Sequence, residues 1–139
     1  MSGERVYGTS WKINKIKNPE NAKWNIRVPG PDMVNLINGF APRDMDDKWM
    51  CCTKGPDDEG NILVRICRSW SSNEIIALKG RVDSDAHKNP RIIGQKGGEI
   101  LEIVWEPGKK GEYEPMNEKR AKEFAIGFCK GLLKCELRP

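Results

Sequence analysis

The sequence has little of what most catalytic and metal sites require. It contains a single histidine, His87, so a histidine-based nucleophile or a zinc site has almost no ligand or base to draw on. It also lacks any apolar run approaching the roughly 18 to 20 residues that cross a bilayer. The residues after Met1 lead into no signal-peptide core, and we therefore expect a cytosolic protein with no membrane partner.

Cysteine is present but lacks a functional spacing. The five cysteines are odd in number, and Cys51 and Cys52 are adjacent, which suits neither a disulfide framework nor a C-x-x-C zinc site. We expect reduced thiols that pack as small hydrophobic groups, and we expect no metal or cofactor.

The composition is typical of a globular domain. Hydrophobic residues make up 37% of the 139 residues and charged residues 32%, and the five tryptophans supply large, stiff groups for a core. This length fits one domain that needs no disulfide bonds. The net charge of +4 mildly favours anionic partners.

The hydrophobic pattern has a period of two along most of the chain. Short strands are expected at residues 5–13, 23–28, 47–53, 62–70, 74–79 and 101–105, separated by turn-forming stretches such as residues 55–61 and 71–73. Because short connections join antiparallel neighbours, residues 46–82 predict a three-stranded meander. Asp32 is expected to cap a helix of about two turns that ends before Gly39, and residues 83–98 to form a flap.

From Asn117 the period changes to 3.6. The apolar residues that recur at helical spacing are Ala121, Phe124, Ala125, Phe128, Leu132 and Cys135. We interpret Gly127 and Gly131 as permitting close approach of this helix to a strand. The sequence thus predicts a single α+β domain, in which a mainly antiparallel sheet of five or six strands has one face covered by an amphipathic helix over residues 117–135.

The strongest functional signal is an arginine on an apolar strand face. Alternation places Ile62, Val64, Ile66, Arg68 and Trp70 on the same side of one strand, with Trp49 on the neighbouring strand. An arginine fork binds carboxylate or phosphate bidentately, and indole rings cover a base or a sugar. Our working hypothesis is a pocket of Arg68, Trp70 and Trp49 that binds a nucleotide, a sugar phosphate or an organic acid. The alternative is a structural ion pair between Arg68 and Asp46 or Asp47.

Two further functions remain open. The carboxylates of Asp44, Asp46 and Asp47 precede a strand, and Asp46 or Asp47 would serve as acid or base if the same pocket belonged to a small enzyme. The interpretation that we favour for them is a helix cap or a loop salt bridge with Lys48 or Arg43. Nucleic-acid binding would use the basic N-terminal third with its interleaved aromatics. In the alternative interpretation, its tryptophans belong to the core. Its residues are Trp11, Lys12, Lys15, Lys17, Lys23, Trp24 and Arg27.

Two loops have the composition of ion-binding or phosphate-binding segments without the full pattern. Asp83, Asp85 and His87 alternate, but no glycine or distal carboxylate completes a calcium loop. Residues 94–99 have the glycines and the lysine of a phosphate loop but not its spacing, so we interpret them as a turn.

The chain resembles a group of small uncharacterised microbial proteins that carry D-K-W followed by R-S-W-[ST]-G-x-x-I-Y. The matching residues are Asp47-Lys48-Trp49 and Arg68-Ser69-Trp70-Ser71, with Ile75 in the isoleucine position, and the resemblance covers about a quarter of the chain. Ser72 replaces the glycine and Ile76 the tyrosine. The resemblance implies that Trp49, Arg68 and Trp70 form one structural unit, and it implies no activity.

Overall fold

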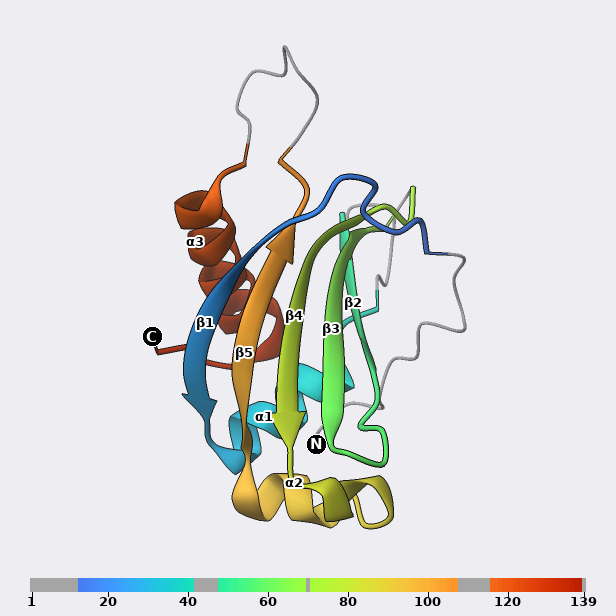
Figure 1. Cartoon of the computed structure of the whole chain (residues 1–139), viewed down its shortest axis with the longest axis vertical. Helices are drawn as coiled ribbons and strands as arrows, with labels where there is room; N and C mark the ends of the chain where they lie inside the picture. The colour runs from blue at the N-terminus through green and yellow to red at the C-terminus, as the bar shows by residue number, and fades with distance from the viewer. Residues whose placement is uncertain (1–12, 42–47, 70, 108–115, 139) are drawn as a thin grey trace.

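The computed structural model describes residues 13–41, 48–69, 71–107 and 116–138. Its five strands form one antiparallel sheet in the order β1-β5-β4-β3-β2 (Figure 1), so the expected α+β fold with a mainly antiparallel sheet is confirmed. The expected meander is β2-β3-β4. The strands are β1 (Glu20–Val28), β2 (Trp49–Lys54), β3 (Asn61–Arg68), β4 (Glu74–Val82) and β5 (Gly98–Trp105).

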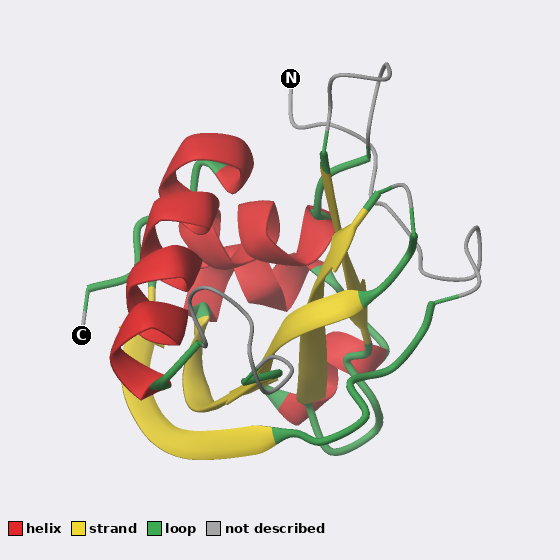
Figure 2. Ribbon diagram, turned by 90° about the horizontal axis from the view of Figure 1, so that it is seen from above, coloured by secondary structure: helices red, strands yellow, loops and turns green. Residues whose placement is uncertain are grey.

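The longer helices cover one face of the sheet. Figure 2 shows the sheet curving around them; neither of them lies on its other face, which we call the open face. Helix α1 contacts β2, and α3 contacts β5. The helices are α1 (Gly30–Asn38), α2 (Arg91–Lys96) and α3 (Glu118–Phe128), with a 3-10 turn, η2 (Ser84–His87), and a π turn, η3 (Cys129–Leu133), that continues α3. Among the described residues, no helix has the length and apolarity needed to cross a bilayer.

The core lies between the sheet and the helices, and the strand alternation that predicts it is confirmed. Ile62, Val64 and Ile66 of β3 point toward the helices and are buried. Burial of a large aliphatic side chain contributes about 1.5 to 3 kcal/mol, so this interface carries most of the stability. The other strands contribute Trp24, Ile26, Val28, Cys51, Ile76, Leu78, Val82, Ile100, Ile103 and Trp105.

The C-terminal helix begins where the period changes. The side chain of Asn117 accepts a hydrogen bond of 2.9 Å from the Arg120 amide, which caps the helix. Of the predicted stripe, Ala121, Ala125, Phe128 and Cys135 are buried and Phe124 is half-buried, but the prediction is wrong for Leu132, which is 38% exposed. The explanation offered for Gly127 and Gly131 is wrong, because both are exposed and a Cβ atom built at either would meet no atom within 4 Å.

Gly127→Ala is therefore expected to stabilise the protein. An exposed glycine inside a helix costs about 0.5 to 1 kcal/mol relative to alanine, because its backbone loses more freedom on folding. Urea unfolding followed by circular dichroism measures the change in the free energy of unfolding. A loss of stability would mean that something packs closely against this glycine after all.

Two local predictions are wrong. Residues 83–98 contain η2 and α2 rather than an irregular flap, since Asp83 caps η2 by accepting a hydrogen bond of 2.9 Å from the Asp85 amide. Asp32 lies in the first turn of α1, where Pro29 occupies the N-cap position. The end of that helix is as expected, because Gly39 has a φ of 76°, which favours glycine.

The open face of the sheet is more apolar than a solvated face requires. Met50, Cys52, Cys67 and Ala77 are buried although they lie outside the cluster beneath the helices. All five cysteines are free and buried, as expected. Burial raises the pKa of the Cys67 thiol to about 12, so it stays protonated and unreactive at neutral pH.

Candidate functional site

Arg68 and Trp49 lie together at one end of the β2-β3 hairpin. Arg68 is the last residue of β3 and pairs in register with Trp49, the first residue of β2. The guanidinium carbon of Arg68 is 4.6 Å from the centroid of the Trp49 ring, which is a cation–π contact. Arg68 is exposed and Trp49 is half-buried, so the cation lies on the solvent side of the indole.

The indole of Trp49 is fixed from below by α3. Its centroid is 5.0 Å from the ring of Phe124 and 6.2 Å from that of Phe128, both in edge-to-face arrangements. Such pairs contribute about 0.5 to 1.5 kcal/mol beyond their buried area. Trp49 therefore supports Arg68 and joins it to the core, whereas the hypothesis from the sequence has it lining a pocket for the ligand.

The backbone around Arg68 is held on both sides. Its amide donates to the Asn73 carbonyl and its carbonyl accepts from the Ser72 amide, each at 2.9 Å. The Ser69 amide donates to the Lys48 carbonyl at 2.9 Å, which ties the turn to the start of β2. The position of the Cα atom of Arg68 is thus determined by the pairing of β2 with β3 and by the turn that joins β3 to β4.

Asn14, which precedes β1, fastens this turn from outside the meander. Its amide donates to the Ser72 carbonyl at 2.9 Å, and its carbonyl accepts from the Glu74 amide at 2.9 Å. Its side-chain nitrogen lies 3.0 Å from the Ser71 carbonyl and 3.0 Å from Oδ1 of Asn73. One asparagine therefore contacts each residue from 71 to 74, and no motif in the sequence predicts this role.

Ser72 adopts a backbone conformation that favours glycine. Its φ is 57°, in the left-handed region, which costs a residue with a side chain roughly 1 kcal/mol.

We expect Ser72→Gly to raise the free energy of unfolding by up to about 1 kcal/mol, measured by urea unfolding. The matched control is Ser71→Gly in the same turn, which has no positive φ to relieve and is expected to destabilise. Equal effects of the two substitutions would contradict the strain at Ser72.

Several predicted site residues lie outside the described residues. Trp70 follows the end of β3, Asp44, Asp46 and Asp47 precede β2, and Trp11 and Lys12 belong to the basic N-terminal third; all six fall in the undescribed ranges. Their proposed roles therefore stay predictions. Within the described part of the chain, no carboxylate lies at ion-pair distance from Arg68.

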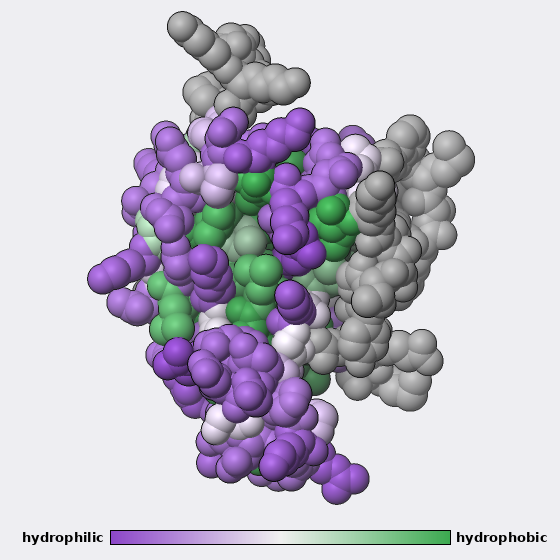
Figure 3. Space-filling model, turned by 45° about the vertical axis from the view of Figure 1, so that its right-hand side comes forward, coloured by the Kyte–Doolittle hydropathy of each residue, from purple (hydrophilic) through white to green (hydrophobic). Residues whose placement is uncertain are grey.

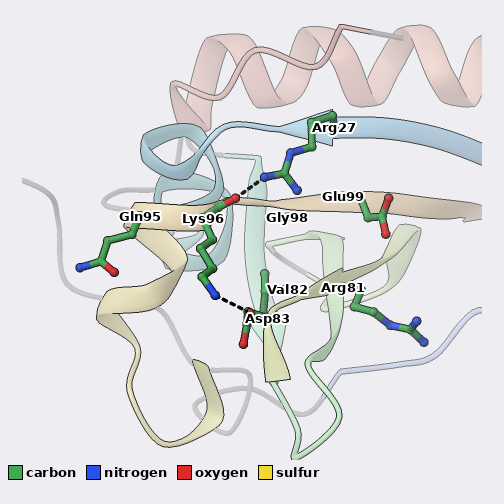
Figure 4. A pocket seen from close by; sticks show the side chains of 9 residues that line it. Arg27, Arg81, Val82, Asp83, Gln95, Lys96, Gly98 and Glu99 are labelled. Atoms are coloured by element: carbon green, nitrogen blue, oxygen red, sulfur yellow. Dashed lines mark hydrogen bonds and ion pairs between the residues drawn. The ribbon is translucent and has the colours of Figure 1, made fainter. Parts of the chain in front are cut away.

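A polar groove of about 520 Å³ lies at the opposite end of the sheet (Figure 4). The Arg27 guanidinium donates to the Lys96 carbonyl, the Lys96 ammonium is 3.0 Å from Asp83, and Arg81 donates weakly to Asn61. These polar groups already have partners within the protein. Their bonds hold α2 against the sheet, so the groove is a weak candidate for a ligand site. It is lined by Arg27, Arg81, Val82, Asp83, Gln95, Lys96, Gly97, Gly98 and Glu99.

The remaining candidates are engaged in structural contacts. Both carboxylate oxygens of Asp83 are occupied, one by the Asp85 amide and the other by the Lys96 ammonium. These bonds, that of the Asp85 amide first, hold the pKa of Asp83 below its usual value. Nδ1 of His87 lies 3.0 Å from the Pro56 carbonyl. Within the described ranges, no cluster of three or more potential ligands is arranged to hold a metal ion. Trp24 is 6% exposed and faces α3, so its indole is not accessible for stacking on bases.

Sequence reasoning missed the arginine whose side chain is largely buried. Nε of Arg65 is 2.5 Å from Oε2 of Glu74, and the two side chains are 15% and 9% exposed. The Ile16 amide approaches the other oxygen of Glu74 at 3.5 Å. Arg65 occupies a position on the open face where a charged residue is ordinary, so the alternation gives no signal of its burial.

Comparison with known proteins finds no match: no family model, no curated protein and no solved structure is significantly similar to this chain. The resemblance of the Arg68 segment to small microbial proteins stays a prediction.

Proposed function

We propose that this protein binds an anionic small molecule, through a carboxylate or phosphate group, at Arg68. The observation that carries the proposal is the exposed guanidinium held 4.6 Å above an indole that is itself anchored on α3.

The stacking of Arg68 on Trp49 prepares the guanidinium for an anion. A guanidinium over a ring keeps its N–H donors in its own plane, so those on the solvent side remain directed at a ligand. Its side chain has already lost part of its freedom before the ligand arrives, which lowers the entropic cost of binding. A planar carboxylate or a phosphate accepts two such bonds side by side.

The exposure of Arg68 sets the expected behaviour of the complex. A site open to solvent is screened by salt, so affinity should fall as ionic strength rises from about 0.05 to 0.2 M. We place the protein in the cytosol in the same proposal, since a reducing compartment keeps its five free cysteines as thiols. The enzyme and nucleic-acid alternatives gain no supporting observation from the described residues.

The test begins with a thermal-shift screen against nucleotides, sugar phosphates and organic acids. A ligand that binds only the native state stabilises it by about 2.7 kcal/mol at a concentration of 100 times Kd, by mass action. The apparent melting temperature therefore rises. A panel in which no anion shifts the melting temperature at millimolar concentration would count against the proposal.

For any anion that binds, Arg68→Gln is expected to weaken binding about 10- to 100-fold, because charge-assisted hydrogen bonds contribute about 1.5 to 3 kcal/mol. Arg68→Lys keeps the charge but not the fork, and should lose roughly tenfold. Isothermal titration calorimetry gives both dissociation constants. The control is Arg91→Gln, an exposed arginine at the start of α2, which should bind as the parent does. Unchanged affinity in Arg68→Gln would assign the anion to another site.

A further inference from the structure

The open face of the sheet carries an apolar patch, which we define as Leu63, Ala77, Leu101 and Val104. Ala77 and Val104 are register partners on β4 and β5, and Leu63 lies one row away on β3. Leu63, Leu101 and Val104 are half-buried, and none of them packs against the core beneath the helices. In Figure 3, apolar side chains gather in the middle of the visible surface between hydrophilic ones. Solvated faces of antiparallel sheets are normally polar, so this patch calls for a partner.

A basic rim surrounds the patch. Lys54 is the register partner of Leu63, and Lys23 is that of Glu102. One row further along, Arg27 and Arg81 lie on either side of Glu99. These four basic residues are exposed, and within the described ranges none of them has a carboxylate at ion-pair distance. Arg27 donates to the Lys96 carbonyl and Arg81 donates weakly to Asn61, but both acceptors are neutral, so the positive charges remain uncompensated.

Among the described residues, the acids on this face are fewer than the basic residues and lie beside basic partners. Glu102 lies 3.6 Å from the ammonium of Lys79 and also accepts a hydrogen bond from Asn21. Glu74 is paired with Arg65. The surplus charge around the patch is therefore positive, and it is complementary to an acidic partner.

The chemistry of the face excludes other occupants. The described residues of the face include no aromatic side chain on which a base would stack, and Glu99 and Glu102 place negative charge among the basic residues, which would repel a phosphate backbone. The apolar side chains are half-buried rather than protruding, so they cannot insert into a bilayer. A second copy would bring one basic rim against another. What fits is a partner that projects its own apolar side chains and carries acids beside them.

We propose that the apolar patch and its basic rim dock an acidic amphipathic helix of another protein. The helix would lie on the open face as α1 and α3 lie on the other, with its apolar stripe on Leu63 and Val104 and its acids reaching the rim. The surface is separate from the proposed anion site, because Arg68 lies over Trp49, which packs on the helix-covered side.

The probe is a fluorescein-labelled synthetic helix of about five turns, with leucine along one face and glutamate on the other. Two control peptides replace every glutamate by lysine or every leucine by serine. Fluorescence anisotropy should show saturable binding of the leucine–glutamate peptide alone. Chemical-shift changes in the unaltered protein should map to the open-face residues of β3, β4 and β5.

Val104→Glu and Leu63→Glu should each weaken binding at least about tenfold, since a carboxylate at the patch would be buried against leucine and acid. The control is Leu132→Glu, which alters an exposed apolar residue on η3, and it should bind normally. Circular dichroism checks that each variant folds. Equal binding of the lysine peptide, or shift changes confined to the other face, would overturn the proposal. Dimers in sedimentation that Val104→Glu abolishes would assign the face to a second copy instead, and sedimentation of the protein with anionic vesicles would assign it to a membrane.

Discussion

Glu74→Ala is expected to lower the free energy of unfolding by about 3 to 5 kcal/mol, a large share of the stability of a domain of this size. The reason is that Arg65 would remain in place without its partner. Its side chain is only 15% exposed, so water replaces the lost carboxylate poorly, and a largely buried cation without a counter-charge is costly. The bond from the Ile16 amide would be lost as well. Urea unfolding followed by tryptophan fluorescence measures the change.

The matched control is Glu102→Ala on the same face of the sheet. Its ion pair with Lys79 spans 3.6 Å, and the two side chains are 26% and 55% exposed, so removal should cost only about 0 to 1 kcal/mol. The double variant Arg65→Met with Glu74→Met should recover most of the stability, because two apolar side chains replace a buried pair without leaving a charge. If Glu74→Ala and Glu102→Ala cost the same, the Arg65–Glu74 pair is solvated and the interpretation is wrong.

The sequence predicts the sheet well, because alternation reports which side of a strand faces the core. In β3 the apolar residues Ile62, Val64 and Ile66 are those that the helices cover. The helix from Asn117 is predicted for the same kind of reason, since the change to a period of 3.6 coincides with a capping asparagine. These signals are local, so one sequence suffices to read them.

Contacts between distant segments are not encoded in such periods. Asn14 looks like turn material, and only the fold brings it to residues 71 to 74. Arg65 and Glu74 are nine residues apart on neighbouring strands, and Glu74 also accepts a hydrogen bond from the amide of Ile16, which is far from it in the sequence. The sequence therefore draws attention to Arg68, which is exposed, and gives no sign of Arg65, whose side chain is largely buried.

The candidate site is predicted in its position and not in its arrangement. The sequence places Arg68 and Trp49 on adjacent strands, which the register confirms. It does not predict that Phe124 and Phe128 hold the indole from the helix side. That arrangement changes the role of Trp49 from a wall of a pocket to a support for the cation. The anchoring residues come from α3, whose docking no local pattern specifies.

Gly30→Ala is the second substitution for which we expect a large loss, of about 3 kcal/mol or more. A Cβ atom at Gly30 would lie 2.0 Å from the carbonyl oxygen of Gly94 and 2.6 Å from its carbonyl carbon. Both are backbone atoms, so no flexible side chain is available to move aside. The start of α1 would have to shift away from α2, and Met33 and Leu36, which α1 buries, would shift with it.

The control lies on the other side of the same contact. A Cβ atom at Gly94 would meet only Cγ2 of Val34, at 3.6 Å, which is an ordinary van der Waals distance. Gly94 lies within α2 and is exposed, so Gly94→Ala should be neutral or should stabilise the protein by up to about 1 kcal/mol. Thermal unfolding of both variants compares them directly. Of these two positions, only Gly30 is required to be glycine by the close approach of α1 to α2, and equal losses in the two variants would mean that the helices pack differently.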